Sequence, residues 1–523
     1  MSEHDLLFTR LKLPTIVKGA GTLFVCGVIA RTLGYAFHIL AAKKVGLTAF
    51  GLYTLGLTLV RALAVDLVLG SRSSTVVRYV SIYHAMRDKA RLKGTICFAL
   101  INAAFLGALS TALIFFLSDF LAVRIFHQPQ LSGVLTHLAF ALPFVGLSAV
   151  LLLATVGVQI MTFQALTKDV FEPLVMLVVF LLLALQGFGL QALIYAYLSS
   201  AILGFIVAYY FFAKTFASLI SSPFFPHPEA KAVTPLFEPK TIFKFALPLV
   251  ITRIVTRLRR QGDILLLGLF VPASQVGLYA IVYKTVNALT EITDSLIGVF
   301  NPMIAASYEE GTLSTLKSQF QILSKWIFSL SFPIILFALF HAKAILSVLG
   351  NQFIGGEHSF IILVLGFLFE MISIPAGQLL TMSGKSIITL INTVGIGVLN
   401  LILFLIFIPQ YGIEGASFAV ALSMLLLGLA RVIEGYKIIG AHPFTRKYLK
   451  PLLATCVALV ITLWVDQALS LNKYLFLACS FATFLLAYLL TLVLIGLDPE
   501  DQFILGKVKE RVLPSKRSRG AIA

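Results

Sequence analysis

The chain contains one apolar run after another, each about 20 residues long, and this recurrence limits the fold more than any other feature. A helix of about 20 apolar residues spans the ~30 Å hydrocarbon core of a bilayer, because its backbone hydrogen bonds are all made internally. Of the 523 residues, 59% are hydrophobic and only 12% are charged, far from the balance of a soluble protein. The sequence therefore predicts an all-α integral membrane protein.

Hydropathy predicts about fourteen transmembrane helices. Residues 1–16 lack an apolar core, so no cleavable signal peptide is predicted and the first helix is expected to direct insertion. The approximate spans are 17–40, 49–70, 94–118, 133–160, 170–187, 190–213, 243–271, 276–298, 326–348, 359–381, 386–408, 413–434, 450–470 and 474–497.

The lysines and arginines are divided unequally between the two sides of these spans. Of the 40 basic residues, 27 fall in the termini, in the loops that would share their side and at the adjoining ends of the spans, and only five fall in the opposite loops. Cytoplasmic loops carry the excess of positive charge. We therefore expect a multi-pass protein of the cytoplasmic (inner) membrane with both termini in the cytoplasm. The five residues on the outer side are Lys43, Lys44, Arg124, Lys343 and Lys473.

The net charge of +17 is scattered over the predicted cytoplasmic loops, notably the segment from Arg78 to Gly94. Topology and anionic lipid headgroups explain such a distribution, and it lacks the localised footprint of a nucleic-acid-binding domain. The four cysteines have no CxxC spacing and the nine histidines form no ligand cluster. No metal, cofactor or nucleic-acid partner is therefore expected.

The sequence also resembles itself. "VGLTAFGLYTLGLTL" from Val45 is similar to "VPASQVGLYAIVYKT" from Val271, and "FGLQALIYA" from Phe188 is similar to "YGIEGASFA" from Tyr411. A third, weaker pair is "GVQIMTFQALTK" around Gln159 and "AGQLLTMSGK" around Gln378. The members of each pair are separated by nearly the same length of chain, which indicates two homologous lobes of six helices each.

This duplication predicts the domain organisation. We expect an N-lobe at 1–214, a proline-rich cytoplasmic linker at 215–240, a C-lobe at 241–440, and helices 13 and 14 with a basic tail at 441–523. Six is an even number, so both lobes enter the membrane in the same direction. Parallel repeats of this kind form transporters that bind substrate between the halves.

Charge inside the predicted seventh helix is the most unusual feature. Four arginines occur in the eight residues 253–260, with apolar sequence on both sides. At 100° per residue, Arg253, Arg257 and Arg260 fall within an arc of about 60°. Arg259 lies nearer to Asp263, which follows it at i+4 and can neutralise it. A charge at mid-depth costs about 2.5–3.5 kcal/mol on the insertion scale, so the stripe is expected to face a cavity.

Other helices bring charge to the same depth, and together these residues predict a basic cavity that suits an anionic passenger. There are three alternatives for these charges. The stripe snorkels to headgroups, Arg31 and Arg61 form internal salt bridges, or Lys284 and Glu291 form a structural pair. The predicted cavity residues are Arg31, Arg61, Arg253, Arg257, Arg260 and Lys284. The predicted residues for coupling or charge balance are Asp263, Glu291 and Glu370.

Several features together carry a family resemblance. They are the 6+6+2 arrangement, "FGLY" and "VGLY" after helices 1 and 7, "YGIEGAS" opening helix 12, and "NPMIAASYEEG" through "LSVLGNQF" around helix 9. The chain resembles the polysaccharide transporter family of the multidrug, oligosaccharidyl-lipid and polysaccharide exporter superfamily. The resemblance implies flipping of a polyprenyl-pyrophosphate-linked oligosaccharide, such as an O-antigen unit, for cell-surface polysaccharide biosynthesis. It implies membrane lipids as partners and leaves room for polysaccharide polymerase or export proteins.

Other functions are weighed against this one. A lipid II flippase would also carry a pyrophosphate. A cation-coupled multidrug exporter favours acidic cavities, whereas the charges at mid-depth here are mainly basic. A membrane enzyme, such as a saccharide polymerase, needs a sizeable loop or paired carboxylates, and the sequence shows neither. We therefore expect a non-enzymatic transporter that works by alternating access.

Overall fold

A computed structural model describes residues 13–62, 72–217, 234, 236, 261–289, 297, 300, 301, 303, 304, 306–440, 442, 443, 445–496, 498 and 501. Every regular element in these ranges is a helix, so the predicted all-α class is confirmed. The chain divides into two compact units. The first comprises residues 1–281 and 404–413, and the second comprises residues 282–403 and 414–523.

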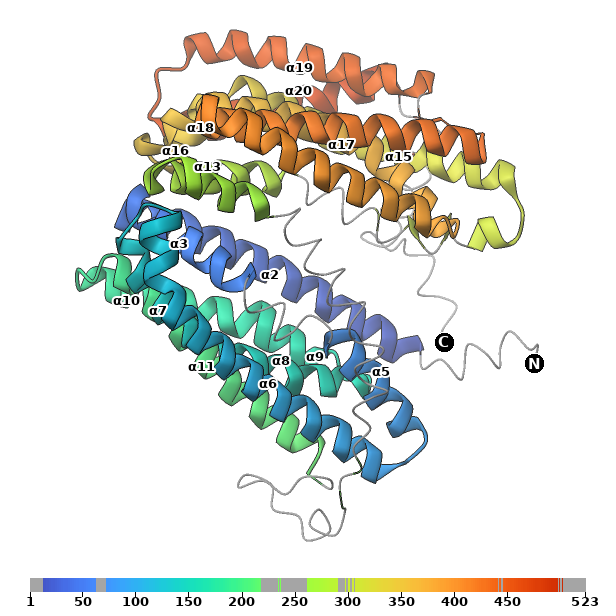
Figure 1. The fold of residues 1–523 in the computed structure, drawn as a ribbon. Helices are drawn as coiled ribbons and strands as arrows, with labels where there is room; N and C mark the ends of the chain where they lie inside the picture. Colours follow the sequence, from blue (N-terminus) through green and yellow to red (C-terminus); the bar gives the residue numbers. More distant parts are fainter. Residues whose placement is uncertain are drawn as a thin grey trace, which may run out of the picture. The chain divides into compact units, whose positions relative to one another are not determined.

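The first unit is built from apolar helices that pack around α8 and α11 (Figure 1). α8 contacts α5, α6 and α11, and α3 contacts α2, α7 and α11. The elements are α2 (Leu13–Val45), α3 (Leu47–Val60), α5 (Arg72–Ala85), α6 (Lys89–Asp119), the π-helix η2 (Phe120–Ile125), α7 (Gln130–Ala139), α8 (Leu142–Gly157), α9 (Thr162–Gln164), the π-helix η3 (Ala165–Phe171), α10 (Glu172–Leu185) and α11 (Leu190–Thr215).

Helix α5 lies in a segment for which hydropathy predicts no span. The basic segment from Arg78 to Gly94 is predicted to connect two spans on the cytoplasmic side; α5 occupies its first part, and α6 already begins at Lys89. Val76, Val80 and Tyr83 repeat at helical spacing and are buried in a cluster with residues of α6, α8 and α11. Burial of this apolar face offsets the cost of ordering a polar segment.

Helix α13 (Ala273–Ala288) approaches α3 at two glycines. A Cβ on Gly51 would overlap the carbonyl oxygen of Ala273, and a Cβ on Gly277 would overlap that of Leu47. Gly51 corresponds to Gly277 in the duplicated sequence, and Leu47 corresponds to Ala273, so each contact is the counterpart of the other. The backbones can approach this closely only because both glycine positions lack a side chain.

The second unit contains the remaining long helices. α15 packs against α17 and α19, and α19 runs beside α20 (Figure 1). The elements are α15 (Leu313–Phe340), α16 (Ala342–Leu349), the 3₁₀ helix η5 (Asn351–Gly356), α17 (Glu357–Met382), α18 (Ser386–Ile439, with residues 404–413 in the first unit), the 3₁₀ helix η6 (Arg446–Tyr448), α19 (Leu449–Ala468) and α20 (Lys473–Ile495).

Polar contacts attach the hairpin of α19 and α20 to α15 at both ends. At one end, Asp466 of α19 pairs with Nε2 of His341 at 2.9 Å and accepts a hydrogen bond from the hydroxyl of Ser480. At the same end, Lys473 donates to the carbonyl of Ser347 at 2.8 Å. These contacts join the hairpin to the end of α15 and to α16, so the cluster fixes how the hairpin lies on them.

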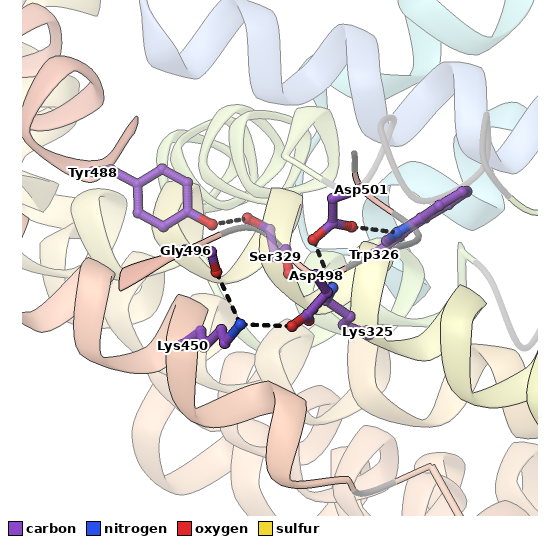
Figure 2. A network of polar contacts seen from close by, with 8 residues as sticks. All are labelled: Lys325, Trp326, Ser329, Lys450, Tyr488, Gly496, Asp498 and Asp501. Carbon is purple, nitrogen blue, oxygen red and sulfur yellow. Dashed lines mark hydrogen bonds and ion pairs between the residues drawn. The ribbon is translucent and has the colours of Figure 1, made fainter. Parts of the chain in front are cut away.

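The other end of the hairpin is held by an ionic cluster around Lys325 of α15 (Figure 2). Lys325 Nζ is 2.5 Å from Oδ2 of Asp498 and 2.7 Å from Oδ2 of Asp501, both of which follow α20. Lys450 Nζ of α19 donates to Oδ1 of Asp498 at 2.6 Å, and the indole of Trp326 donates to Asp501 at 3.1 Å. Burial alone would raise the pKa of Asp498, but the hydrogen bonds and positive charges of the two lysines outweigh it and hold that pKa below its ordinary value of 3.8.

Two glycines at matched positions of the duplicated sequence have the same unusual backbone. Gly189 has φ 56° and ψ −127°, and Gly412 has φ 55° and ψ −127°. Only glycine adopts this region readily, because a Cβ would clash with the backbone. Gly189 precedes α11, and Gly412 breaks α18 between the spans predicted for helices 11 and 12.

Within the described residues, nine helices are long and apolar enough to span a membrane. The chain is therefore a multi-pass membrane protein. The span Ile387–Lys437 is 51 residues long and contains the break at Gly412, so one continuous element covers two predicted crossings. The total of fourteen helices and the lobe boundaries at 214 and 241 stay predictions.

Candidate functional site

Arg61 is a predicted cavity residue that lies at the end of α3. It caps the C-terminus of α3, where its backbone N–H reaches the carbonyls of Leu57 and Thr58, and its side chain is half-buried. The guanidinium carbon lies 5.7 Å from the centre of the Tyr197 ring on α11. An arginine over an aromatic face gains electrostatic stabilisation while it keeps donors for another partner.

Tyr53 lies two turns before Arg61 on the same helix and interacts electrostatically with it. Its side chain is completely buried. Among the described residues, its hydroxyl has no hydrogen-bond partner. A buried hydroxyl without a partner is costly, so this group is available to a ligand or to a changed arrangement of its neighbours.

A second charged pair lies inside the same unit. Lys168, in the π-helix η3, is 2.5 Å from Oε1 of Glu172, the first residue of α10, and the two side chains are only 25% and 20% exposed. The carboxylate packs on Gly204 of α11, where a Cβ would overlap it. Glu172 also interacts electrostatically with Arg61. Arg61, Lys168, Glu172 and Tyr53 together are called the N-unit polar cluster below.

Sequence reasoning missed Lys168 and Glu172. The hydropathy pattern places the fifth span at 170–187, which assigns Lys168 to a loop and leaves Glu172 unremarked near the start of an apolar run. The signal is present as an i,i+4 lysine–glutamate pair with its acid inside the span. The π-helical turn between residues 165 and 171 is a further sign, since such turns occur frequently at functional sites.

Asp263 is a predicted acidic residue that the structure shows to be buried. It lies in the described helix Gln261–Phe270 and is 4% exposed. Its Oδ1 accepts from the backbone N–H of Ile264 at 2.8 Å, and its Oδ2 accepts from the hydroxyl of Tyr279 at 2.9 Å. The neighbour suggested by the sequence, Arg259, lies outside the described residues. The carboxylate therefore has a neutral phenol donor that helical spacing did not suggest.

The duplicated sequence makes this pair informative. Tyr279 is the counterpart of Tyr53, and Asp263 is the counterpart of Phe37, in the alignment that pairs Val45 with Val271. Both tyrosines are fully buried. In the first copy, the Phe37 ring packs edge-on against Tyr53 with centroids 6.4 Å apart. In the second copy, an acid takes the place of that ring, so the two copies differ in charge at matched positions.

The other predicted residues in the described ranges lie on three different helices. Arg31 is exposed on α2, Lys284 is exposed on α13, and Glu370 is half-buried on α17. Arg31, Arg61 and Asp263 belong to the first unit, and Lys284 and Glu370 to the second. The other four lie outside the described residues: Arg253, Arg257, Arg260 and Glu291. The cavity predicted between the lobes stays a prediction.

A cavity of about 510 Å³ occurs in the first unit beside the start of α3. Its walls are formed by Thr48 and Leu52, the turn at 126–130, and residues 269–273. Gln128 Nε2 lies 3.4 Å from the carbonyl oxygens of both Gly268 and Val271. The walls contain none of the charged residues singled out above, so the N-unit polar cluster is the stronger candidate site.

Comparison with known proteins identifies a family match. The family described as "Polysaccharide biosynthesis protein" matches residues 16–307, which is more than half of the chain. Among curated individual proteins there is no match.

Several solved structures have the same fold. "Lipid II flippase MurJ, inward closed conformation" is 16% identical, with 90% of this chain and 97% of that chain covered and a TM-score of 0.72. An inward-facing multidrug resistance MATE family transporter of the MOP superfamily is 15% identical, with coverages of 80% and 98% and a TM-score of 0.60. A MOP superfamily transporter from Pyrococcus furiosus, described as having a binding pocket of reverse polarity, is 16% identical, with coverages of 81% and 96% and a TM-score of 0.55. At these identities, the likeness establishes the fold.

Proposed function

Because the chain belongs to the polysaccharide biosynthesis protein family, we propose that it is a transporter that flips an anionic lipid-linked oligosaccharide across the cytoplasmic membrane. The passenger would be a polyprenyl-pyrophosphate-linked repeat unit used for cell-surface polysaccharide, for example an O-antigen unit. Both termini would lie in the cytoplasm. Polysaccharide polymerase or export proteins would receive the product.

The observation that carries this proposal is the half-buried Arg61 inside a membrane-spanning unit, over Tyr197 and beside a lysine–glutamate pair. Guanidinium groups bind phosphate oxygens through two parallel hydrogen bonds and stay charged at any working pH. The hydrocarbon tail of the passenger can remain in the bilayer, so the protein needs to shelter only the diphosphate and sugars. Arg31, Arg253, Arg257, Arg260 and Lys284 are proposed to complete the basic cavity.

Energy coupling is proposed at the acids. Asp263 is buried and is held by one phenol and one backbone amide, so its environment changes if α13 moves relative to its own helix. Glu291 and Glu370 are the other candidates for coupling or charge balance. We propose no chemical step and no cofactor. The passenger would leave with its covalent structure unchanged.

The test is export by cells that lack their own flippase for this passenger, with membrane insertion of each variant verified by immunoblot. Arg61→Ala, and Arg257→Ala combined with Arg260→Ala, should each abolish export and leave lipid-linked intermediates on the cytoplasmic side. Arg124→Ala is the matched control, because Arg124 is exposed on η2 in the same unit. Wild-type export by both charge-removal variants would refute the basic cavity.

A lipid II flippase is the second candidate, favoured by the likeness to the MurJ structure over 90% of this chain. Vesicles that contain either lipid II or a polyprenyl-pyrophosphate-linked oligosaccharide separate the two functions, because only the proper passenger should become accessible in the outer leaflet. Mass spectrometry of the recovered lipid adds a further distinction. A product of altered mass would indicate an enzyme, and an unchanged mass supports transport.

A further inference from the structure

The N-unit polar cluster holds a carboxylate where the proposed function needs room for a phosphate. Glu172 is bound at 2.5 Å by Lys168 and interacts across the helix interface with Arg61. Asp169 also contributes to the field at Glu172. Within the described ranges, the charged groups that act on this carboxylate are thus two cations and one further acid. A diphosphate that binds Arg61 must compete with Glu172.

The packing shows that the carboxylate is accommodated specifically. Gly204 of α11 is the residue against which it lies, and a Cβ at this position would overlap Oε1. Glu172 stands at the junction of η3 and α10, so a change in the π-helical turn would shift it relative to Lys168. The completely buried hydroxyl of Tyr53, which has no hydrogen-bond partner in the described part of the chain, interacts electrostatically with the same arginine.

Carboxylate and phosphate oxygens accept the same hydrogen bonds from guanidinium and ammonium groups. We propose that Glu172 is an internal counter-anion, which neutralises Lys168 and Arg61 in the empty protein and is displaced when a substrate phosphate binds there. Its return to the two cations then assists release on the far side of the membrane. Glu172 is therefore a specificity residue that prevents the basic site from holding phosphate too tightly. This inference rests on the proposed function.

Pyrophosphate binding by the purified full-length protein in lipid nanodiscs provides the first test. Glu172→Gln keeps the shape of the side chain and removes its charge, so it should bind inorganic pyrophosphate about tenfold more tightly than the wild type, because a charge-assisted competitor is lost. Glu172→Asp keeps a competing carboxylate, one methylene shorter, and should bind pyrophosphate less tightly than Glu172→Gln does. Glu310→Gln, which removes an exposed carboxylate of the second unit, is the matched control and should bind as the wild type does.

A second variant keeps the inference testable if Glu172→Gln folds poorly. Gly204→Ala retains all charges but pushes the carboxylate away from its position, so it should also tighten pyrophosphate binding, by a smaller factor. In vesicles, both variants should lower the KM for the lipid-linked saccharide and also lower kcat, because release becomes slower. A change confined to folding would not produce this split.

The outcomes separate the two levels of the proposal. Equal or weaker pyrophosphate binding by folded Glu172→Gln and Gly204→Ala, or no binding by any variant, would overturn the counter-anion role. If the wild type still flips the lipid-linked saccharide in that case, the proposed function stands without it. If the wild type fails to flip this passenger, the proposed function falls, whatever the pyrophosphate measurements show.

Discussion

Replacing Asp498 and Asp501 together by asparagine should strongly destabilise the second unit. Both carboxylates bind the ammonium group of Lys325, at 2.5 and 2.7 Å, and Lys325 is only 4% exposed. The double substitution preserves the size of both side chains but removes both carboxylates that pair with the buried lysine among the described residues. Such a change costs about 3–5 kcal/mol, because the remaining charge is neither hydrated nor neutralised.

The effect should be graded in a way that identifies its cause. Asp498→Asn alone leaves Asp501 paired with Lys325, and the partly exposed Lys450 can be hydrated. The free energy of unfolding should therefore fall by only about 1.5–3 kcal/mol. Adding Lys325→Met to the double variant removes the stranded charge. Most of the lost stability should then return, since a buried ion pair and a well-packed apolar group are often similar in free energy.

Trp326 provides the assay, because its indole donates to Asp501 at 3.1 Å and only one other tryptophan, Trp464, occurs in the chain. In a Trp464→Phe background, the fluorescence of Trp326 reports on this cluster alone. Unfolding by sodium dodecyl sulfate in mixed micelles gives the relative free energies. The reasoning is refuted if the triple variant is no more stable than the double variant, or if the double variant unfolds within about 1 kcal/mol of the parent.

Three further predictions concern acid, close packing and buried hydroxyls. Two lysines hold the pKa of Asp498 down despite its burial. The stabilising effect of the ionised carboxylate is present above its unfolded pKa and is lost as pH falls through the lower folded value. The fluorescence of Trp326 should therefore be constant from about pH 8 to 5 and change only below about pH 4. A loss that begins near neutrality would contradict this assignment. Gly51→Ala should lower the free energy of unfolding by about 1–3 kcal/mol through overpacking. Gly133→Ala should leave it unchanged, because Gly133 has open space around it. Equal thermal stability of the two variants would disprove the close approach of α3 and α13. Tyr279→Phe removes the phenol that donates to Asp263 and should lower the free energy of unfolding by about 1–3 kcal/mol. Tyr53→Phe removes a hydroxyl that has no hydrogen-bond partner among the residues the structure describes, and it should be neutral or stabilising. Equal losses of thermal stability by the two variants would refute the contrast.

Long apolar helices were the most predictable part of the fold. Hydropathy predicts the sixth span at 190–213 and the helix occupies Leu190–Thr215; it predicts the last span at 474–497 and the helix occupies Lys473–Ile495. These ends agree because a bilayer fixes the length of an apolar helix and leaves its backbone no alternative hydrogen bonds. Hydropathy did not show α5, whose polar face lowers the average although its valines and tyrosine repeat at helical spacing.

The candidate site was predicted only in part. Arg61 stood out because a charge within an apolar run is conspicuous on inspection. Lys168 and Glu172 did not, because they lie at the start of a run, where a charge is ordinarily hydrated. The partner of Asp263 could not be found from periodicity, since Tyr279 lies on the next helix. Contacts between helices depend on tertiary packing, which no local pattern contains.

The charges inside the helical units are of two kinds, and this difference bears on function. Lys325 is bound by two carboxylates and lies in a cluster that also contains Lys450 and Trp326. The loss of any one of these residues therefore leaves its partners without a hydrogen bond or a counter-charge. Such a group stabilises the folded structure, but replacing its carboxylate partners with a bound substrate would cost much free energy. Arg61 lies over an aromatic ring and interacts with Glu172 at longer range. A binding arginine must be able to leave its resident partner for a passenger, and of the two cations only Arg61 meets this requirement. Removal of Lys325 should therefore impair folding, whereas removal of Arg61 should impair export in a protein that still folds.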